Sequence, residues 1–225
     1  MESDEKAIRQ SIQYLNKNKR DFIEYYVKDA KPQKKKTAIF TAGMSGVGKT
    51  ELAKFFKEQN SDLLHIDTDE IREFFRPVGY NGQNSDLFQK VASRGFSELF
   101  TYALKNDLSL IMDSNFANIE MAKQNIGRLI KKSYEIDIFY LYDYEQLCFE
   151  YAQRREIVTH RKVPKDVFLR SNTESYKTIL AIKELFKEQV TINFFDKREN
   201  DKNDIYNNIE VETIKDLIGE DFDIQ

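Results

Sequence analysis

Two patterns of hydrophobic residues alternate along this chain. From residue 37 onward, short runs that are mostly apolar are separated by longer stretches whose apolar residues recur every three or four positions. The short runs are typical of strands covered on both faces, and the longer stretches are typical of helices. We predict strands at 37–42, 63–66, 108–112, 136–142 and 190–195, and helices at 49–59, 69–75, 85–105, 118–132, 144–158 and 165–188.

This alternation predicts an α/β fold with a parallel, doubly wound sheet of about five strands. Residues 4–29 place apolar side chains at helical spacing, which predicts one or two N-terminal helices. After residue 197 the chain is polar and acidic, and we expect a last short strand at 205–211 and a helix at 212–219. The expected organisation is an N-terminal helical segment (1–30), a central α/β domain (37–198) and a C-terminal extension of the same domain (199–225).

Composition narrows the function classes. The chain has 225 residues, 40% of them hydrophobic, and a net charge of −3, so no basic field suggests a nucleic-acid partner. The one cysteine, Cys148, excludes an internal disulfide, and its neighbours Leu147 and Phe149 predict a packed, inert thiol. No apolar run approaches the length of about 18 residues that a membrane span needs, and the charged N-terminus lacks a signal sequence. We therefore expect a cytoplasmic protein without a membrane partner.

Residues 43–50 carry the clearest chemical motif. Their sequence, Gly-Met-Ser-Gly-Val-Gly-Lys-Thr, fits the P-loop pattern G-x-x-x-x-G-K-[ST], and it lies between a predicted strand and a predicted helix, as a phosphate-binding loop requires. Glycines allow successive N–H groups to face a phosphate chain, and the helix N-terminus adds its positive dipole end. Lys49 can reach the β- and γ-phosphates of ATP, and the Thr50 hydroxyl can bind Mg²⁺. The alternative is an ordinary glycine turn before a helix. We expect the nucleotide to contact Gly43, Met44, Ser45, Gly46, Val47, Gly48, Lys49 and Thr50.

Carboxylates follow two of the predicted strands. Asp67 and Asp69 come after strand 63–66, and Asp113 comes after strand 108–112. Ligands of open α/β sheets bind beyond the carboxyl ends of the strands, so these side chains are candidates for the active site. One of Asp67 and Asp69 is expected to cap the following helix, and the other to help hold Mg²⁺ or to take a proton from an acceptor hydroxyl. His65 lies inside an apolar strand and is predicted to be a satisfied core histidine, since two histidines, His65 and His160, are too few and too scattered for a metal cluster.

Arg154 and Arg161 are candidates for a lid over the phosphates. They are seven residues apart, which is about two helical turns and therefore places them on one face. Guanidinium groups suit phosphate oxygens because they donate two parallel hydrogen bonds. The alternative is a solvated basic face that pairs with Glu150 and Glu156.

In this order, the motifs resemble the zeta toxin family of P-loop kinases from bacterial toxin–antitoxin systems. The matching pieces are 43–50, 66–69, 76–80, 110–115, Arg154, 161–164 and 194–198. The resemblance implies transfer of phosphate from ATP to the 3′-hydroxyl on the amino sugar of UDP-N-acetylglucosamine. It further implies that Lys49 binds the ATP phosphates, Thr50 binds Mg²⁺, Asp69 is the base, and Arg154 and Arg161 stabilise the migrating phosphoryl group. Asp67, Glu98, Asp113 and Asn115 correspond to positions near the substrate.

Two departures from the family pattern concern the acceptor. Asp113-Ser114-Asn115 stands where the better-known members have Glu-Gly-Thr, and Arg76-Pro77 stands where they have His-Pro. The acceptor can therefore be another nucleotide sugar or a different small molecule. Other readings are a polynucleotide kinase, a nucleotide-dependent binding module, and an interaction protein with a degenerate site. An antitoxin is a possible partner, and the N-terminal helices either pack against the domain or restrain its active site.

Overall fold

The computed structural model describes residues 2–160, 163–198 and 204–222 and contains a six-stranded sheet in the order β2-β3-β1-β4-β5-β6. The first five strands are parallel, which confirms the predicted doubly wound sheet. The sixth is an antiparallel edge strand and is shorter than the predicted segment 205–211. An antiparallel neighbour needs no helical crossover. The strands are β1 (Thr37–Ala42), β2 (Leu64–Asp67), β3 (Leu110–Asp113), β4 (Glu135–Tyr142), β5 (Thr191–Asp196) and β6 (Asp204–Tyr206).

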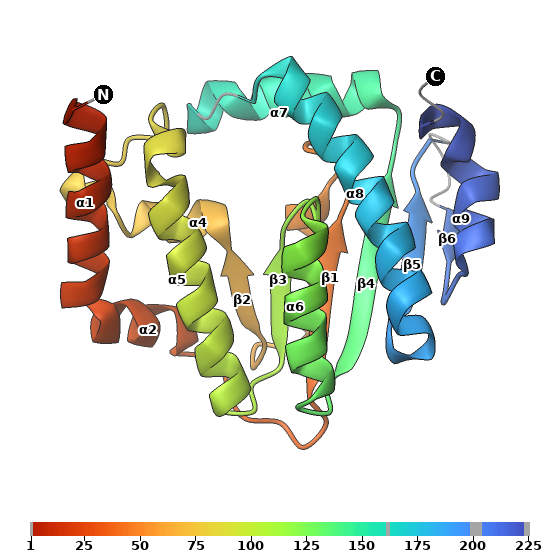
Figure 1. The fold of residues 1–225 in the computed structure, drawn as a ribbon, viewed down its shortest axis with the longest axis horizontal. Helices are drawn as coiled ribbons and strands as arrows, with labels where there is room; N and C mark the ends of the chain where they lie inside the picture. Colours follow the sequence, from red (N-terminus) through yellow and green to blue (C-terminus); the bar gives the residue numbers. More distant parts are fainter. Residues whose placement is uncertain (1, 161–162, 199–203, 223–225) are drawn as a thin grey trace.

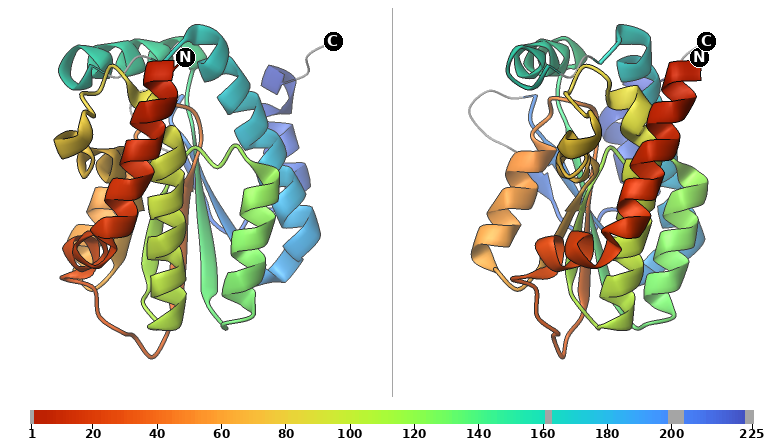
Figure 2. Two further views of the ribbon diagram at one scale, coloured as in Figure 1. Left: turned by 60° about the vertical axis from the view of Figure 1, so that its left-hand side comes forward. Right: turned by 90° about the vertical axis from the view of Figure 1, so that its left-hand side faces the viewer.

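Helices cover both faces of the sheet. One face packs against α3, and the other packs against α5, α6 and α8 (Figures 1 and 2). α7 passes across the edge at which the parallel strands end (Figure 1). The helices are α1 (Glu2–Lys17), α2 (Lys19–Val27), α3 (Lys49–Gln59), α4 (Thr68–Glu73), α5 (Ser85–Lys105), α6 (Ile119–Ile130), α7 (Glu145–Thr159), α8 (Lys165–Phe186) and α9 (Val211–Ile218). None of the described helices is long and apolar enough to cross a membrane.

The predicted helix 69–75 is shorter in the structure. α4 ends at Glu73, and a 3₁₀ turn follows at Arg76–Val78. Pro77 explains the change, because proline disfavours helical backbone in the residue before it and donates no hydrogen bond.

The N-terminal helices are part of the core. α1 packs against α5, and α2 packs against α5 and β2. Phe22 of α2 is fully buried, and a Cβ on Gly95 of α5 would lie only 2.9 Å from its ring. The Tyr26 hydroxyl donates a hydrogen bond of 2.9 Å to the carbonyl of Glu70. These contacts support the packing role that the sequence left open.

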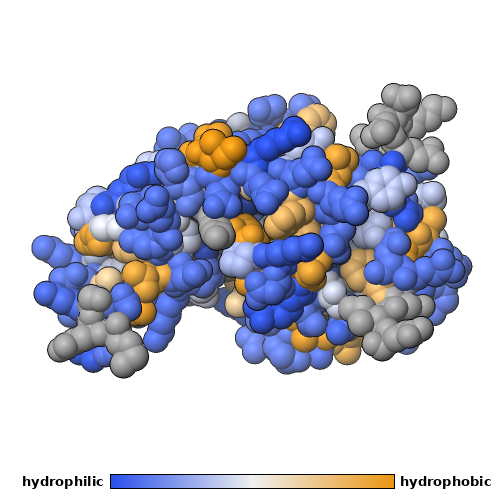
Figure 3. Space-filling view, turned by 90° about the horizontal axis from the view of Figure 1, so that it is seen from above, coloured by the Kyte–Doolittle hydropathy of each residue, from blue (hydrophilic) through white to orange (hydrophobic). Residues whose placement is uncertain are grey.

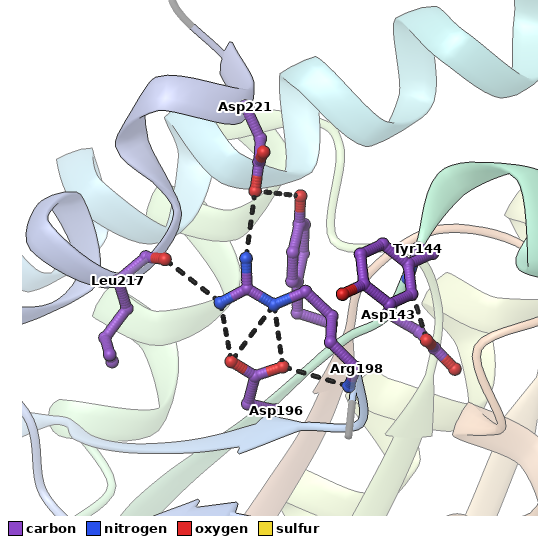
Figure 4. A network of polar contacts seen from close by, with 7 residues as sticks. Asp143, Tyr144, Asp196, Arg198, Leu217 and Asp221 are labelled. Carbon is purple, nitrogen blue, oxygen red and sulfur yellow. Dashed lines mark hydrogen bonds and ion pairs between the residues drawn. The ribbon is translucent and has the colours of Figure 1, made fainter. Parts of the chain in front are cut away.

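The C-terminal segment is joined to the same sheet. Figure 4 shows the Arg198 guanidinium between Asp196, at the end of β5, and Asp221, beyond α9, with nitrogen–oxygen distances of 2.7 and 3.3 Å. Arg198 also donates to the carbonyl of Leu217 at 3.0 Å. α9 buries Val211, Ile214 and Ile218. The segment 204–222 is thus fixed beside the carboxyl end of β5.

Candidate active site

A cavity of about 620 Å³ opens at the carboxyl edge of the parallel strands. Seen from above this edge, the molecule is mostly hydrophilic, with hydrophobic residues in small groups (Figure 3). The cavity is lined by the P-loop, the start of α4, the end of β3, one side of α7 and Lys197. Its place agrees with the general rule for ligand sites in open α/β sheets.

The backbone conformation of the P-loop depends on its glycines. Gly43, Gly46 and Gly48 have φ angles of +125°, +84° and +102°, which residues other than glycine rarely adopt. A Cβ on Gly46 would lie 2.1 Å from the carbonyl oxygen of Cys148 in α7. The loop backbone therefore packs directly against α7, and Gly46 is needed both for its backbone angle and for this close approach.

Two lysines reach the loop from different elements. Lys49 Nζ donates to the carbonyl of Met44 at 2.6 Å, and burial lowers the pKa of Lys49 to about 8. Lys197 Nζ, from the end of β5, donates to the carbonyl of Val47 at 2.8 Å. Both ammonium groups line the cavity, so two positive charges would face a phosphate chain bound there. We did not predict a role for Lys197, although it follows a strand end just as Asp113 does.

Asp67 is the aspartate that caps α4. Its Oδ1 accepts a hydrogen bond of 2.7 Å from the backbone N–H of Asp69. Burial, and then the charges of Asp69 and Asp113, raise the pKa of Asp67 to about 7. Asp113 lies beside Asp67 in the neighbouring strand, and its Oδ1 accepts a hydrogen bond of 2.9 Å from Thr41.

Asp69 lies on the first turn of α4 and lines the cavity. Its carboxylate forms an ion pair with Arg72, whose side chain is almost fully buried and also bonds Gln89. Because the arginine is fixed by burial and by two partners, it holds the carboxylate in place. The spacing of three residues on one helix is a signal that sequence reasoning could have used.

The lid arginines differ from the prediction. Arg155 and Tyr151 of α7 line the cavity, whereas the Arg154 side chain is 71% exposed and lies 3.9 Å from Glu150. Arg154 does not line the cavity, and its guanidinium covers the Tyr151 ring. Arg161 lies outside the described residues, and α7 ends at Thr159.

Of the other predicted residues, Thr50, Asp113 and Asn115 line the cavity. Glu98 does not line it. Its carboxylate lies 2.7 Å from Lys19 Nζ, and this ion pair joins α5 to α2.

A second cavity of about 380 Å³ adjoins the first. The two share Thr68, Gln89, Ser114 and Asn115. Apolar side chains from the sheet, α5, α6 and the loop between β3 and α6 form much of its wall: Phe40, Phe96, Met112, Phe116 and Met121. An apolar wall with a few amides and hydroxyls is typical of small-molecule sites.

The prediction for His65 was wrong. Its Nδ1 lies 3.6 Å from the carboxylate of Glu70, and its Nε2 is buried without a hydrogen-bond partner among the described residues. An unpaired buried nitrogen is not that of a satisfied core histidine.

Comparison with known proteins relates this site to a family. The Zeta toxin family model matches residues 20–210. No curated protein sequence gives a significant match.

Solved structures give further similarity at the level of the fold. A protein of the PezAT chromosomal toxin–antitoxin system of Streptococcus pneumoniae is 16% identical, with a TM-score of 0.68 over 92% of this chain and 86% of its own. The AvrRxo1-ORF1:AvrRxo1-ORF2 complex with ATP gives 10% identity and a TM-score of 0.70 over 94% of this chain and 72% of its own. A candidate kinase of Chloroflexus aurantiacus is 15% identical, with a TM-score of 0.52 over 83% and 95% of the two chains.

Proposed function

We propose that this chain, which belongs to the zeta toxin family, is a Mg²⁺-dependent kinase that transfers the γ-phosphoryl group of ATP to a hydroxyl of a nucleotide sugar. One observation carries the proposal. The P-loop cations and the Asp69 carboxylate line the same cavity, and a second cavity adjoins it through Thr68 and Gln89. Phosphoryl transfer needs charge on the phosphates and a proton acceptor at the attacking hydroxyl, and both are present.

The residues around the P-loop suit the triphosphate. Lys49, Lys197 and Arg155 are positive groups in the cavity wall, and the φ angles of the glycines turn the loop around it. The Thr50 hydroxyl, at the start of α3, would hold Mg²⁺. ATP supplies the phosphoryl group, and these side chains bind and orient it.

Asp69 is the proposed base. Arg72 positions its carboxylate, and the shared wall of Thr68 and Gln89 leads from it to the second cavity. An acceptor bound there would direct a hydroxyl toward Asp69, which would take the proton as the oxygen attacks phosphorus. The family resemblance names the 3′-hydroxyl of UDP-N-acetylglucosamine or of a related nucleotide sugar as this group.

The test is a transfer assay with γ-labelled ATP, Mg²⁺ and a panel of nucleotide sugars, nucleosides and 5′-hydroxyl oligonucleotides. We expect label on a nucleotide sugar, and a loss of kcat of about 10²- to 10⁴-fold in Asp69→Asn with little change in ATP affinity. Labelled oligonucleotides in place of sugars would favour a polynucleotide kinase. ATP hydrolysis without any labelled acceptor would favour a nucleotide-dependent binding module, and unreduced kcat in Asp69→Asn would remove this residue from the role of base.

We further propose that the protein is a toxin restrained by an antitoxin. Family membership supports this role, and two of the structural neighbours come from a toxin–antitoxin system and a two-protein complex. Induced expression of the unmodified protein in bacteria should arrest growth, and induced expression of the Lys49→Ala variant should not. Equal arrest by both proteins would contradict a toxic activity that depends on phosphoryl transfer.

A further inference from the structure

Three potential metal ligands meet on strands β2 and β3. His65, Asp67 and Asp113 each offer one ligand atom, and these atoms lie within 4.8 Å of one another. Asp67 and Asp113 are paired neighbours in the parallel ladder. His65 lies two residues before Asp67, so both side chains point to the same face of the sheet. The strand register thus brings one imidazole and two carboxylates together.

Two of these residues have a buried polar atom without a partner. Within the described part of the chain, no hydrogen bond reaches His65 Nε2 or Asp113 Oδ2. Asp113 is only 5% exposed, and its other oxygen already accepts from Thr41. Leaving such atoms unpaired costs free energy, and two neighbouring buried carboxylates also repel each other. A positive ligand that binds all three side chains removes both costs.

We propose that His65, Asp67 and Asp113 bind a divalent transition-metal ion such as Mn²⁺ or Zn²⁺, independently of ATP. An imidazole ligand favours these ions over Mg²⁺, which prefers oxygen ligands alone. Glu70, 3.6 Å from His65 Nδ1, is placed to orient the ring, as carboxylates commonly do for metal-bound histidines.

The geometry needs only a small closure. With metal–ligand bonds of about 2.1 Å, the ligand atoms lie at most about 4.2 Å apart, so atoms that lie within 4.8 Å of one another need approach by no more than some tenths of an ångström. Asp67 and Asp113 line the large cavity, which gives an ion access from solvent. His65 distinguishes this site from the Mg²⁺ that accompanies ATP at Thr50. The proposal does not rest on kinase activity.

The experiment is titration of the untagged, nucleotide-free protein with Mn²⁺, followed by EPR. We expect one bound ion, with coupling to an imidazole nitrogen in the pulsed spectrum. His65→Gln should weaken binding on the order of 100-fold and remove the coupling, and Glu70→Gln should weaken it about tenfold. His160→Asn is the matched control, because asparagine tolerates the φ of 60° at that helix end.

The control variant should bind as the unmodified protein does. If His65→Gln fails to fold, the nitrogen coupling in the spectrum of the unmodified protein tests the proposal. Loss of that coupling in His160→Asn would show that His160, and not His65, is the ligand, and would overturn the proposal. Absence of binding at millimolar Mn²⁺, or binding without nitrogen coupling, would overturn the proposal.

Discussion

At the scale of single residues, two adjacent arginines of α7 differ in position. Arg155 lines the cavity, whereas Arg154 is exposed and pairs with Glu150 across one helical turn. We predict that Arg155→Ala lowers kcat about 10²- to 10³-fold, because it removes positive charge from the transferring phosphoryl group. Arg154→Ala should change kcat less than about threefold, as loss of an exposed ion pair does. Steady-state kinetics of both variants measures the difference. A larger loss of kcat in Arg154→Ala than in Arg155→Ala would show that α7 rotates when the site closes over ATP.

The thiol of Cys148 gives a prediction with a defined pH dependence. The side chain is fully buried, and burial followed by the charge of Asp143 raises its pKa to about 12. The reactive species is the thiolate, so in the folded protein its fraction should keep rising tenfold per pH unit from pH 8 to 10. In unfolded protein the rise should level off above the ordinary pKa of 9.0. At pH 8 we expect modification to be at least about 100-fold slower in the folded state, because the buried thiol is both protonated and closed to the reagent. Stopped-flow labelling with a chromogenic disulfide measures both rates. Equal rates in folded and unfolded protein would show that the Cys148 thiol is not buried.

The sequence predicted some of the residues that line the cavity and not others, for physical reasons. The P-loop and the strand-end aspartates were predictable because backbone geometry ties them to local patterns. The conformation of the turn after β2 determines that Asp67 caps α4 and that Asp69 forms the ion pair with Arg72. Lys197 lies 150 residues from its partner Val47, and Glu98 is engaged by Lys19 from another helix. Such contacts are fixed by tertiary packing, which no local pattern records.

At the scale of elements, the contact between the P-loop and α7 can be tested through glycine. Gly46 and Gly79 both have positive φ, but a Cβ on Gly79 would meet nothing within 4 Å, whereas one on Gly46 would collide with the α7 backbone. We predict that Gly79→Ala lowers the free energy of unfolding by about 1 kcal/mol, the usual cost of a left-handed alanine. Gly46→Ala should cost at least about 3 kcal/mol and abolish ATP binding. Urea unfolding and calorimetry would measure this, and similar losses in both variants would argue against close packing of α7 on the loop.

The N-terminal helices give a second test at this scale. Phe22 is fully buried against α5 and Phe74, whereas Tyr25 in the same helix is 62% exposed. Phe22→Ala should lower the free energy of unfolding by about 3–5 kcal/mol, and Tyr25→Ala by less than about 1 kcal/mol. Urea denaturation measures both. If Phe22→Ala instead left stability unchanged and raised kinase activity, the helices would be a restraint on the active site rather than part of the core.

Element types and order were predictable from the sequence because strands covered on both faces leave a strong hydrophobic pattern. The helix 85–105 has the predicted bounds. The edge strand β6 was harder to predict, because a strand that is covered on one side only leaves a weak hydrophobic pattern. Its pairing also depends on where β5 ends. Pro77 marked the early end of α4 but was not used for that purpose.

At the scale of the whole molecule, the cavity joins the P-loop, α4, α7 and the end of β5, so a nucleotide bound there holds four parts of the fold together. A ligand that binds only the folded state stabilises it by about 2.7 kcal/mol at 100 times its Kd. For a domain of this size, that corresponds to a rise in Tm of about 5–10 °C. We therefore predict such a rise with saturating Mg²⁺ and a non-hydrolysable ATP analogue, in the absence of any acceptor. Lys49→Ala should lose most of the shift while unfolding normally without ligand, since among the described residues the Lys49 side chain donates its hydrogen bond to Met44 of its own loop. Differential scanning calorimetry distinguishes the possibilities: a shift that survives Lys49→Ala would place the nucleotide elsewhere, and no shift in the unmodified protein would leave the chain as an interaction protein with a degenerate site.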